Sequence, residues 1–344
     1  MNPDRVSPAR RAFLAGCAAL GAGTLLPGCA SQQAGSAARR IDVHHHVAPP
    51  TYTTALKSIM RSHAPWSLQQ SLEDMDRSGI ATAVTSLINP GAWFGDPALA
   101  RKIARDANEF GARLMRDHPG RFGAFATIPY PDTEGSLKEI EYALDTLKVD
   151  GFVLMTNYGG KYLGDTAFWP VLEELNRRKV VIYTHPLTAQ CCGGLLPGTG
   201  VPDSAIEFAV DTTRTMASLM FSGAAARFPD IRWIFSHSGG VTPFLLSRFE
   251  RVVVETKDID RKLPNGLMYE LQKFYYDTAQ GNHAGALAAL MKIVPVSQVL
   301  YGTDFPFRDG AEVNGGLAAY GFSAAELRAI NRDNALRLMP RLPA

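Results

Sequence analysis

The residues best suited to chemistry are five of the eight histidines and one aspartate, each at the end of a short apolar run. They are His44, His45 and His46 in "IDVHHHV", His185 in "YTHP", His237 in "FSHSGG" and Asp304 in "YGTDFP". Imidazole nitrogens together with a carboxylate oxygen form a donor set that suits Zn²⁺, and Mn²⁺ or Fe²⁺ also accept it. The pattern predicts a site for one divalent metal ion, with zinc favoured.

The three consecutive histidines do not have the same role in this prediction. Side chains alternate between the two faces of a strand, so His44 and His46 share one face and His45 lies on the other. We predict that His44 and His46 are metal ligands and that His45 is either a packed residue or one that supports the ligands from behind. Asp42 is a candidate partner behind His44, provided that the strand is regular.

The remaining site residues come from other strands. We predict His185 and Asp304 as the further metal ligands. His237 is either a fifth ligand or a catalytic histidine that shuttles a proton, and Asp304 is a second candidate for proton transfer. A lone histidine at a strand end is usually structural, but this set recurs at equivalent points of a repeating pattern.

Eight short runs rich in Val, Ile and Phe alternate with longer amphipathic stretches, such as 67–79 and 96–120. Nearly continuous apolar runs are typical of parallel strands buried on both faces. The sequence therefore predicts an α/β protein with a single (β/α)₈ TIM barrel over residues 40–344. A doubly wound open sheet is the alternative, but it favours a glycine-rich loop after the first strand. The expected strands are 41–46, 80–88, 122–128, 151–156, 180–184, 231–236, 274–279 and 298–302.

Residues 1–39 have the features of an export signal and linker. Arg10 and Arg11 precede an apolar stretch over 12–26 that is too short to span a membrane, and the order resembles a twin-arginine signal. "LLPGC" resembles a lipoprotein cleavage box with Cys29 as the lipidated residue, although Pro27 fits that box poorly. We expect an exported, periplasmic protein, with a lipid anchor at Cys29 as one form and ordinary signal cleavage as the other.

Composition and cysteine usage exclude several classes of protein. The net charge is +2 and the charges are spread along the chain, so the clustered basic face of a nucleic-acid-binding protein is not expected. Outside the export segment the cysteines are Cys191 and Cys192, which exclude a disulfide framework. For these neighbours, two free thiols are favoured over a bridge.

The ordered motifs Ile-Asp-x-His-x-His, Thr-His-Pro, Ser-His-x-Gly-Gly and Gly-Thr-Asp-Phe-Pro resemble those of the amidohydrolase superfamily. The resemblance covers residues 40–340 and is greatest to the branch around aminocarboxymuconate-semialdehyde decarboxylase, which includes resorcylate- and methylsalicylate-type decarboxylases. It implies one divalent metal in a (β/α)₈ barrel, with His237 beside a metal-bound water. The ligands that it implies are His44, His46, His185 and Asp304. The strand-four end "GFVLMTN" lacks the lysine of two-metal relatives, which favours a single ion.

The resemblance also implies how a substrate acid is held. Arg248 matches an arginine that reaches a neighbouring subunit's site and binds the substrate carboxylate, which implies a homodimer; otherwise it is an exposed helix residue. Trp93 and Phe94, in "NPGAWFGD", form either an aromatic wall for a planar acid or ordinary loop packing. Arg61 and Arg214 are further candidates for binding the acid.

These residues support three functional hypotheses. The first is a metal-dependent carboxy-lyase acting on a small aromatic or conjugated carboxylic acid, such as a hydroxybenzoate, with Asp304 or His237 passing a proton. The second is a hydrolase that uses the same site, in which a metal-activated water attacks a lactone or amide. The third, a binding protein without activity, ranks last because it predicts an incomplete ligand set.

Overall fold

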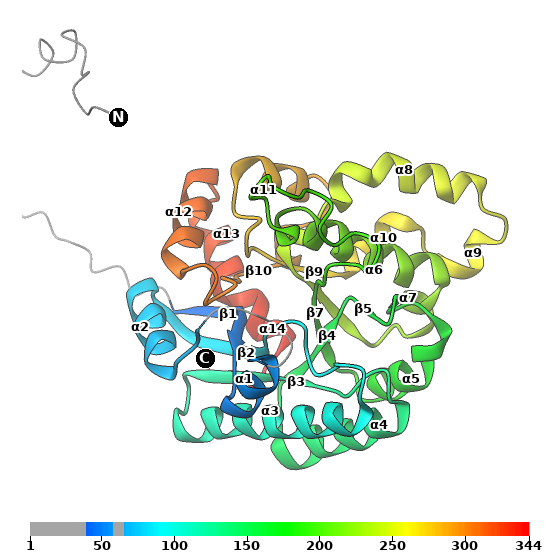
Figure 1. Ribbon diagram of the computed structural model, residues 1–344. Coiled ribbons are helices and arrows are strands. Elements are labelled where there is room, and N and C mark those ends of the chain that lie inside the picture. The colour runs from blue at the N-terminus through cyan, green and yellow to red at the C-terminus, as the bar shows by residue number, and fades with distance from the viewer. Residues whose placement is uncertain (1–38, 58–64, 344) are drawn as a thin grey trace, which may run out of the picture. The chain divides into compact units, whose positions relative to one another are not determined.

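The computed structural model describes residues 39–57 and 65–343 of the chain. Eight parallel strands lie at its centre, and Figure 1 shows helices packed around them. Each expected strand is present, with ends within two residues of the predicted ones. In sheet order the strands are β1 (Arg40–Val47), β2 (Ile80–Leu87), β3 (Phe122–Thr127), β4 (Gly151–Met155), β7 (Val181–His185), β8 (Arg232–Phe235), β9 (Tyr275–Asp277) and β10 (Val299–Leu300).

The sheet closes on itself because the first strand bonds to the segment that contains and follows the last. The backbone N–H of Val43 donates to the carbonyl of Tyr301 at 3.0 Å, and that of His46 donates to Phe305 at 2.8 Å. In return, the Asp304 N–H donates to the carbonyl of His44 at 2.8 Å. The predicted (β/α)₈ barrel is thereby confirmed, and the open-sheet alternative is wrong.

Local signals in the sequence set the ends of the surrounding helices. The Ser67 hydroxyl accepts from Gln70 N at the start of α2, which ends at Gly79 in the left-handed conformation (φ 68°). Asp96 caps α3 in the same way, with Pro97 in its first turn. The helices are α1 (Pro50–Lys57), α2 (Leu68–Ser78), α3 (Pro97–Asp117), α4 (Thr133–Glu141), α5 (Trp169–Arg177), α6 (Glu207–Ser222), α7 (Ala224–Arg227), α8 (Thr242–Glu255), α9 (Ile259–Lys262), α10 (Leu267–Lys273), α11 (Ala284–Met291), α12 (Gly310–Tyr320), α13 (Ala324–Arg328) and α14 (Asn334–Leu338).

Aromatic side chains fill the barrel beneath the histidines. The Tyr183 ring of β7 stacks on Phe125 of β3, with centroids 5.6 Å apart. Its other side meets the edge of the His44 ring at 5.0 Å. All five residues of β4 and of β7 are buried, as expected of strands covered on both faces. The aromatic side chains of this packed interior contact the histidine rings from below and keep them at one end of the barrel.

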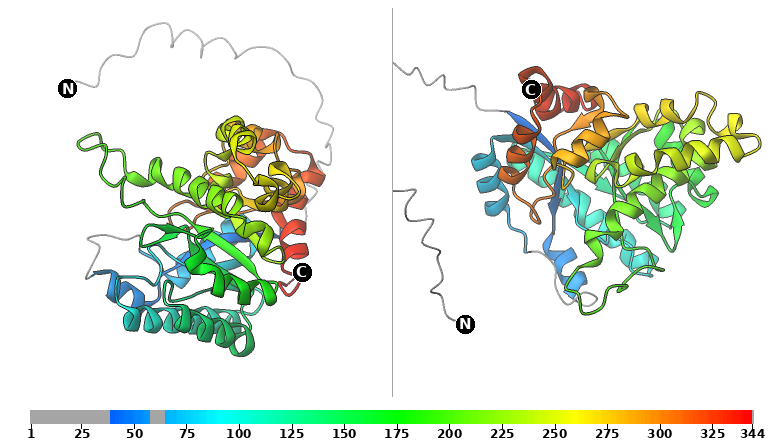
Figure 2. Two further views of the ribbon diagram at one scale, coloured as in Figure 1. Left: turned by 90° about the vertical axis from the view of Figure 1, so that its right-hand side faces the viewer. Right: turned by 90° about the horizontal axis from the view of Figure 1, so that it is seen from above.

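Three features beside the barrel were not predicted. A small antiparallel hairpin, β5 (Asn157–Tyr158) and β6 (Lys161–Tyr162), follows β4. A long exposed loop joins β7 to α6 and extends from the barrel, as Figure 2 shows. Within this loop Cys191 and Cys192 form a disulfide bond, so the expectation of two free thiols is wrong. The two sulfur atoms lie on neighbouring residues and need no long-range folding to meet.

Helix α8 is the least covered of the long helices. Thr242 is its one fully buried residue, and the helix extends away from the strands in Figure 1. Across the described ranges, we find no helix with both the length and the apolar character needed to cross a bilayer.

Candidate metal centre

The histidines and the aspartate predicted from the sequence meet at the carboxyl end of the barrel. One ligand atom from each of His44, His185, His237 and Asp304 lies within 4.8 Å of the others. His46 joins this cluster, because its Nε2 atom is 3.0 Å from Nε2 of His44 and 3.1 Å from Oδ1 of Asp304. Strands β1 and β7 supply three of these residues, and the segments after β8 and β10 supply the other two.

His45 points away from the cluster, as the alternation predicts. Its Nδ1 lies 3.0 Å from Oδ2 of Asp42, and its Nε2 lies 2.8 Å from the Ser71 hydroxyl. Asp42 was expected to stand behind His44, but its carboxylate contacts the His45 ring instead. The strand register shifts between Asp42 and His45, which removes the regular alternation on which that expectation depended.

Asp277 is the partner of His44 that sequence reasoning missed. Its Oδ2 atom lies 2.8 Å from Nδ1 of His44, and both side chains are fully buried. This contact fixes the His44 ring so that Nε2 faces the cluster. The signal was present in "FYYDTA", which places a carboxylate at the end of the seventh strand, equivalent to the strand ends that supply the histidines.

The outer nitrogens of two other rings also have partners. Nδ1 of His46 lies 3.2 Å from the Ser86 hydroxyl, and Nδ1 of His185 lies 3.0 Å from the carbonyl oxygen of Pro186. Each contact leaves the Nε2 atom of that ring directed inward. The outer contacts therefore orient the inner nitrogens toward one point, as the second layer of a metal site does.

Gln280 is a second residue that sequence reasoning missed. Its side-chain amide donates to Oδ2 of Asp304, which leaves Oδ1 of the same carboxylate facing His44 and His46. No motif in the sequence marks Gln280. Its backbone has φ 50°, and those of His237 and Asp304 have φ 55° and 71°. Such left-handed non-glycine conformations are uncommon and tend to cluster at functional sites.

Electrostatics couple the buried groups of the cluster. Burial lowers the pKa of an imidazole, but the carboxylates of Asp277 and Asp304 outweigh it and raise the pKa of His44 to about 10. Burial opposes ionisation of Asp304, yet His44 and the other imidazoles hold its pKa well below the usual range. Burial and the adjacent rings lower the pKa of His185. Without a metal ion, the cluster thus favours a protonated His44 next to an ionised Asp304.

The atoms at the centre of the cluster fit a cation. Nε2 of His44, Nε2 of His46 and Oδ1 of Asp304 lie within 3.1 Å of one another, and all three present lone pairs when the outer nitrogens carry the protons. Among the described residues, Oδ1 of Asp304 and both ring nitrogens of His237 are buried without a hydrogen-bond partner. A divalent ion bound by nitrogen and oxygen donors would satisfy the Asp304 oxygen and, at most, one of the two His237 nitrogens.

A pocket of about 160 Å³ adjoins the cluster on the His237 side. A cavity of similar size, about 150 Å³, is known to accept one benzene ring. Two phenylalanines lie beside the histidines of the cluster. The ring centroid of Phe208 is 5.9 Å from that of His185, and the ring centroid of Phe307 is 6.0 Å from that of His46. The lining of the pocket includes Ser204, Phe208, His237, Ser238, Phe244 and Gln280.

The residues predicted to bind a substrate lie elsewhere in this chain. Trp93 packs against the main core, and Phe94 lies 6.1 Å from the ring of Tyr52 in a smaller apolar cluster. Neither residue lines the pocket beside His237. Arg248 is exposed on α8, and Arg61 lies outside the described residues. The roles of Trp93, Phe94 and Arg248 remain predictions.

Comparison with known proteins places this site in context. A family model described as amidohydrolase matches residues 41–341. Decarboxylase yanB of Aspergillus niger is 36% identical over 323 residues, which cover 88% of each chain. A 6-methylsalicylic acid decarboxylase of Aspergillus aculeatus is 32% identical over 324 residues, covering 88% of this chain and 96% of that protein.

A solved structure shares the fold at lower identity. The dihydroxybenzoic acid decarboxylase of Polaromonas sp., solved with bound manganese and the inhibitor 2-nitroresorcinol, superposes with a TM-score of 0.77 at 22% identity. The match covers 89% of this chain and 98% of that one.

Proposed function

The chain belongs to the amidohydrolase family, and from that premise we propose that it is a metal-dependent carboxy-lyase for a small hydroxybenzoate-type acid. The observation that carries the proposal is the similarity, across nearly the whole barrel, to fungal proteins named as decarboxylases, one of them for 6-methylsalicylic acid. The pocket beside His237 has room for one such ring. These relatives favour loss of CO₂ over the hydrolysis of a lactone or amide.

We propose that His44, His46, His185 and Asp304 hold one divalent ion, with His237 beside it. The sequence favours Zn²⁺, but the manganese of the Polaromonas relative makes Mn²⁺ our first choice. When bound, the ion supplies a Lewis acid that binds substrate oxygens and orients the carboxylate. If the purified protein bound Zn²⁺ in preference to Mn²⁺ when both ions were offered, Zn²⁺ would again be the favoured metal.

Two residues of the chain are placed to move a proton. Nε2 of His237 lies 3.5 Å from Oδ2 of Asp304, and His237 lines the pocket. A proton on one of these two atoms transfers to the ring carbon that carries the carboxylate. The bond from that carbon to the carboxyl group then breaks, so that one substrate carboxylate and one proton give one arene and one CO₂.

Arg248 extends the proposal to a homodimer. It lies exposed on α8 and has no ion pair with any described residue. The same helix exposes Phe244 by 70% and Val254 by 78%, which is apolar surface of the kind that a second subunit covers. We propose that Arg248 binds the substrate carboxylate in the partner subunit's site.

Export is a separate part of the proposal. The twin-arginine-type segment and Cys29 lie outside the described residues, so this part depends on their sequence. We propose a periplasmic location, with lipidation at Cys29. Mass spectrometry of the mature protein from the native host tests it, because a mature chain that begins at a lipid-modified Cys29 is the expected result.

The first test of function is a metal-dependent assay of CO₂ release. The purified protein, loaded with Mn²⁺, is given 6-methylsalicylate or 2,6-dihydroxybenzoate. We expect about one ion per chain in the wild type and none in a His44→Ala, His46→Ala double variant, with CO₂ release falling by roughly a thousandfold, since a metal ion contributes several kcal/mol. A pH-stat assay with lactones is run beside it. Acid release from a lactone without CO₂ release from any acid would overturn the proposal.

A His237→Asn variant separates catalysis from metal binding. We expect it to keep the ion, because the predicted ligands are unchanged, and to lose about 100-fold or more in kcat, as is typical for loss of a general acid. Unchanged kcat in this variant would remove His237 from the mechanism.

A further inference from the structure

The direction of the His185 ring depends on a single peptide group. Nδ1 of His185 lies 3.0 Å from the carbonyl oxygen of Pro186, to which it donates. The N–H at the other end of that peptide group belongs to Leu187. It donates to the Thr156 hydroxyl at 3.2 Å and to Oδ2 of Asp211 at 3.3 Å. If the peptide plane turned, the carbonyl would turn with it and the ring would lose its outer partner.

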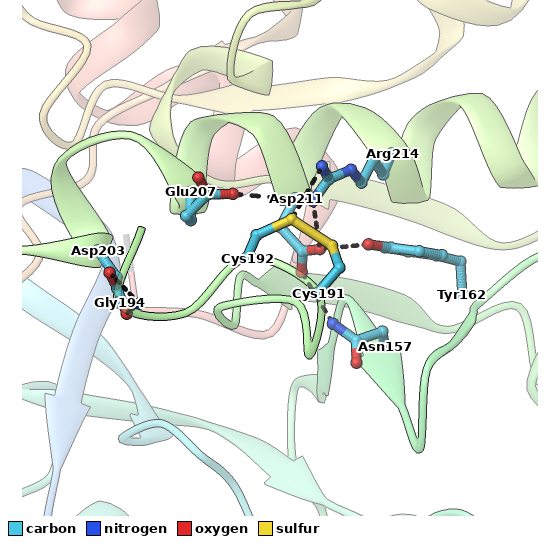
Figure 3. The surroundings of a disulfide bond; sticks show 9 residues. All are labelled: Asn157, Tyr162, Cys191, Cys192, Gly194, Asp203, Glu207, Asp211 and Arg214. Atoms are coloured by element: carbon cyan, nitrogen blue, oxygen red, sulfur yellow. Dashed lines mark hydrogen bonds and ion pairs between the residues drawn. A yellow bond between two sulfur atoms is a disulfide. The ribbon is translucent and has the colours of Figure 1, made fainter. Parts of the chain in front are cut away.

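Asp211 is a fully buried carboxylate on α6 that collects neutral donors from several segments. The Tyr162 hydroxyl donates to Oδ1 at 2.6 Å, and the Asn157 amide donates to Oδ2 at 3.0 Å. The Thr156 hydroxyl also donates to Oδ2. Figure 3 shows Asn157 and Tyr162 directed toward this carboxylate from the strand-four side. The carboxylate therefore joins the segment after β4 to the segment after β7.

The same segments also hold the main chain of His185. The Thr156 N–H donates to the carbonyl of His185 at 3.0 Å, so Thr156 contacts the chain on both sides of the Pro186 residue. The fourth strand brings no metal ligand in this chain. Its end is used instead to fix the ligand of the next strand.

An arginine three residues further along α6 faces the charge on Asp211. Nη1 of Arg214 lies 3.9 Å from Oδ1 of Asp211, and Nη2 lies 3.7 Å from the sulfur of Cys192. Figure 3 shows the Arg214 side chain directed toward both the disulfide and the Asp211 carboxylate. Since the arginine is not in direct hydrogen-bond contact with Asp211, neutral donors, one of them the Leu187 N–H, stabilise the buried charge.

The two carboxylates behind the histidines act over different distances. Asp277 contacts Nδ1 of His44 directly, whereas the chain of contacts from Asp211 reaches Nδ1 of His185 through one peptide group. We propose that Asp211 is a positioning residue of the metal centre, which orients the His185 imidazole through the Pro186–Leu187 peptide. This inference rests on the metal centre of the proposed function and assigns a new residue to it.

The test measures metal affinity, apart from activity. Metal-free wild type and an Asp211→Asn variant, which keeps the side-chain shape, are titrated calorimetrically with Mn²⁺. We expect the dissociation constant of the variant to rise about 10- to 100-fold, the usual effect of removing a group that orients a ligand. An unchanged dissociation constant, with or without a lower Tm, would overturn the inference.

Matched variants separate positioning from general stability. Tyr162→Phe removes one donor to the same carboxylate without touching the peptide group, so its Tm should fall while its dissociation constant stays within about twofold of wild type. Thr156→Val removes the second acceptor of the Leu187 N–H, and we expect a severalfold weaker affinity. The Thr156→Val variant also tests the inference if the Asp211→Asn variant does not fold. Equal loss of affinity in Tyr162→Phe and Asp211→Asn would show a structural role and refute positioning.

The same titration distinguishes this inference from the proposal on which it rests. A wild type that binds neither Mn²⁺ nor Zn²⁺ would refute the metal centre itself. A wild type that binds one ion, together with an Asp211→Asn variant of equal affinity, would refute the role of Asp211 alone.

Discussion

The two sides of the candidate metal centre are built differently. On the β1 side, His44 is held by direct contact with the buried carboxylate of Asp277, and only residues 48 and 49 separate β1 from α1. On the β7 side, His185 depends on the peptide that follows it, and an exposed loop with a disulfide begins directly afterwards. Ligands of one site can therefore be fixed either by a partner in the barrel or by the local chain.

The largest effect should appear on the β1 side when His45 is replaced by alanine. His45 bonds to Asp42 and Ser71, so the variant removes one hydrogen-bond partner from each of two buried polar groups and creates a cavity. We expect the free energy of unfolding to fall by about 2–4 kcal/mol in urea titrations. The Mn²⁺ dissociation constant should change by less than about threefold, because the alternation of the strand directs His45 away from the ion.

The control for this variant is His118→Ala, a partly exposed histidine far from the cluster in sequence. Its effect on unfolding should be below about 1 kcal/mol, as for most surface changes. If His45→Ala abolished metal binding without destabilising the protein, the assignment of His44 and His46 as ligands and of His45 as a structural residue would be wrong.

A smaller effect, on metal affinity, should distinguish the two carboxylates. Asp277→Asn removes the direct partner of His44, and we expect affinity for Mn²⁺ to fall by up to about 100-fold. The loss should be at least as large as in Asp211→Asn, because no peptide group intervenes. Asp150→Asn, at a partly buried aspartate bonded to the Ala124 N–H, is the control and should leave affinity unchanged. A larger loss in Asp211→Asn than in Asp277→Asn would reverse the comparison.

The smallest effect concerns pH. The folded metal-free protein raises the pKa of His44 from its ordinary 6.5 to about 10. The resulting stabilisation is fully present below pH 6.5 and is lost as pH rises through about 10. We expect the Tm of the metal-free protein to fall between pH 7 and pH 10 by more than that of a His44→Asn variant, which lacks this group.

Metal binding requires the same proton to leave His44, so affinity for Mn²⁺ should rise over this pH range. Parallel Tm curves for wild type and His44→Asn would show that the carboxylates do not hold a proton on His44. No such dependence is expected from His185, whose pKa is lowered by burial.

Much of this molecule could be predicted from its sequence because the barrel repeats one unit. Eight apolar runs marked eight strands, and the strand ends marked where His44, His185 and Asp304 would meet. Asp277 follows the same rule, but its strand end, "FYYDTA", has no histidine to mark it as part of a metal site.

The contacts of Asp211 and Gln280 could not be predicted in this way. Asp211 lies on a helix, and its partner Thr156 is 55 residues away. Gln280 reaches Asp304 across 24 residues from a strained turn. Side-chain direction in such segments depends on tertiary packing, which no local periodicity encodes. The bridge between Cys191 and Cys192 depends instead on the local conformation of the loop.

The closure of the barrel has a consequence for how the protein matures. The hydrogen bonds that join the two ends of the sheet include His44, His46 and Asp304, so the seam of the barrel and the candidate metal centre share residues. A nascent chain still attached to the ribosome at residue 300 has the histidines but neither the seam nor its aspartate. The barrel therefore closes only after its last strand has been synthesised, and the candidate metal centre is complete only in a closed barrel.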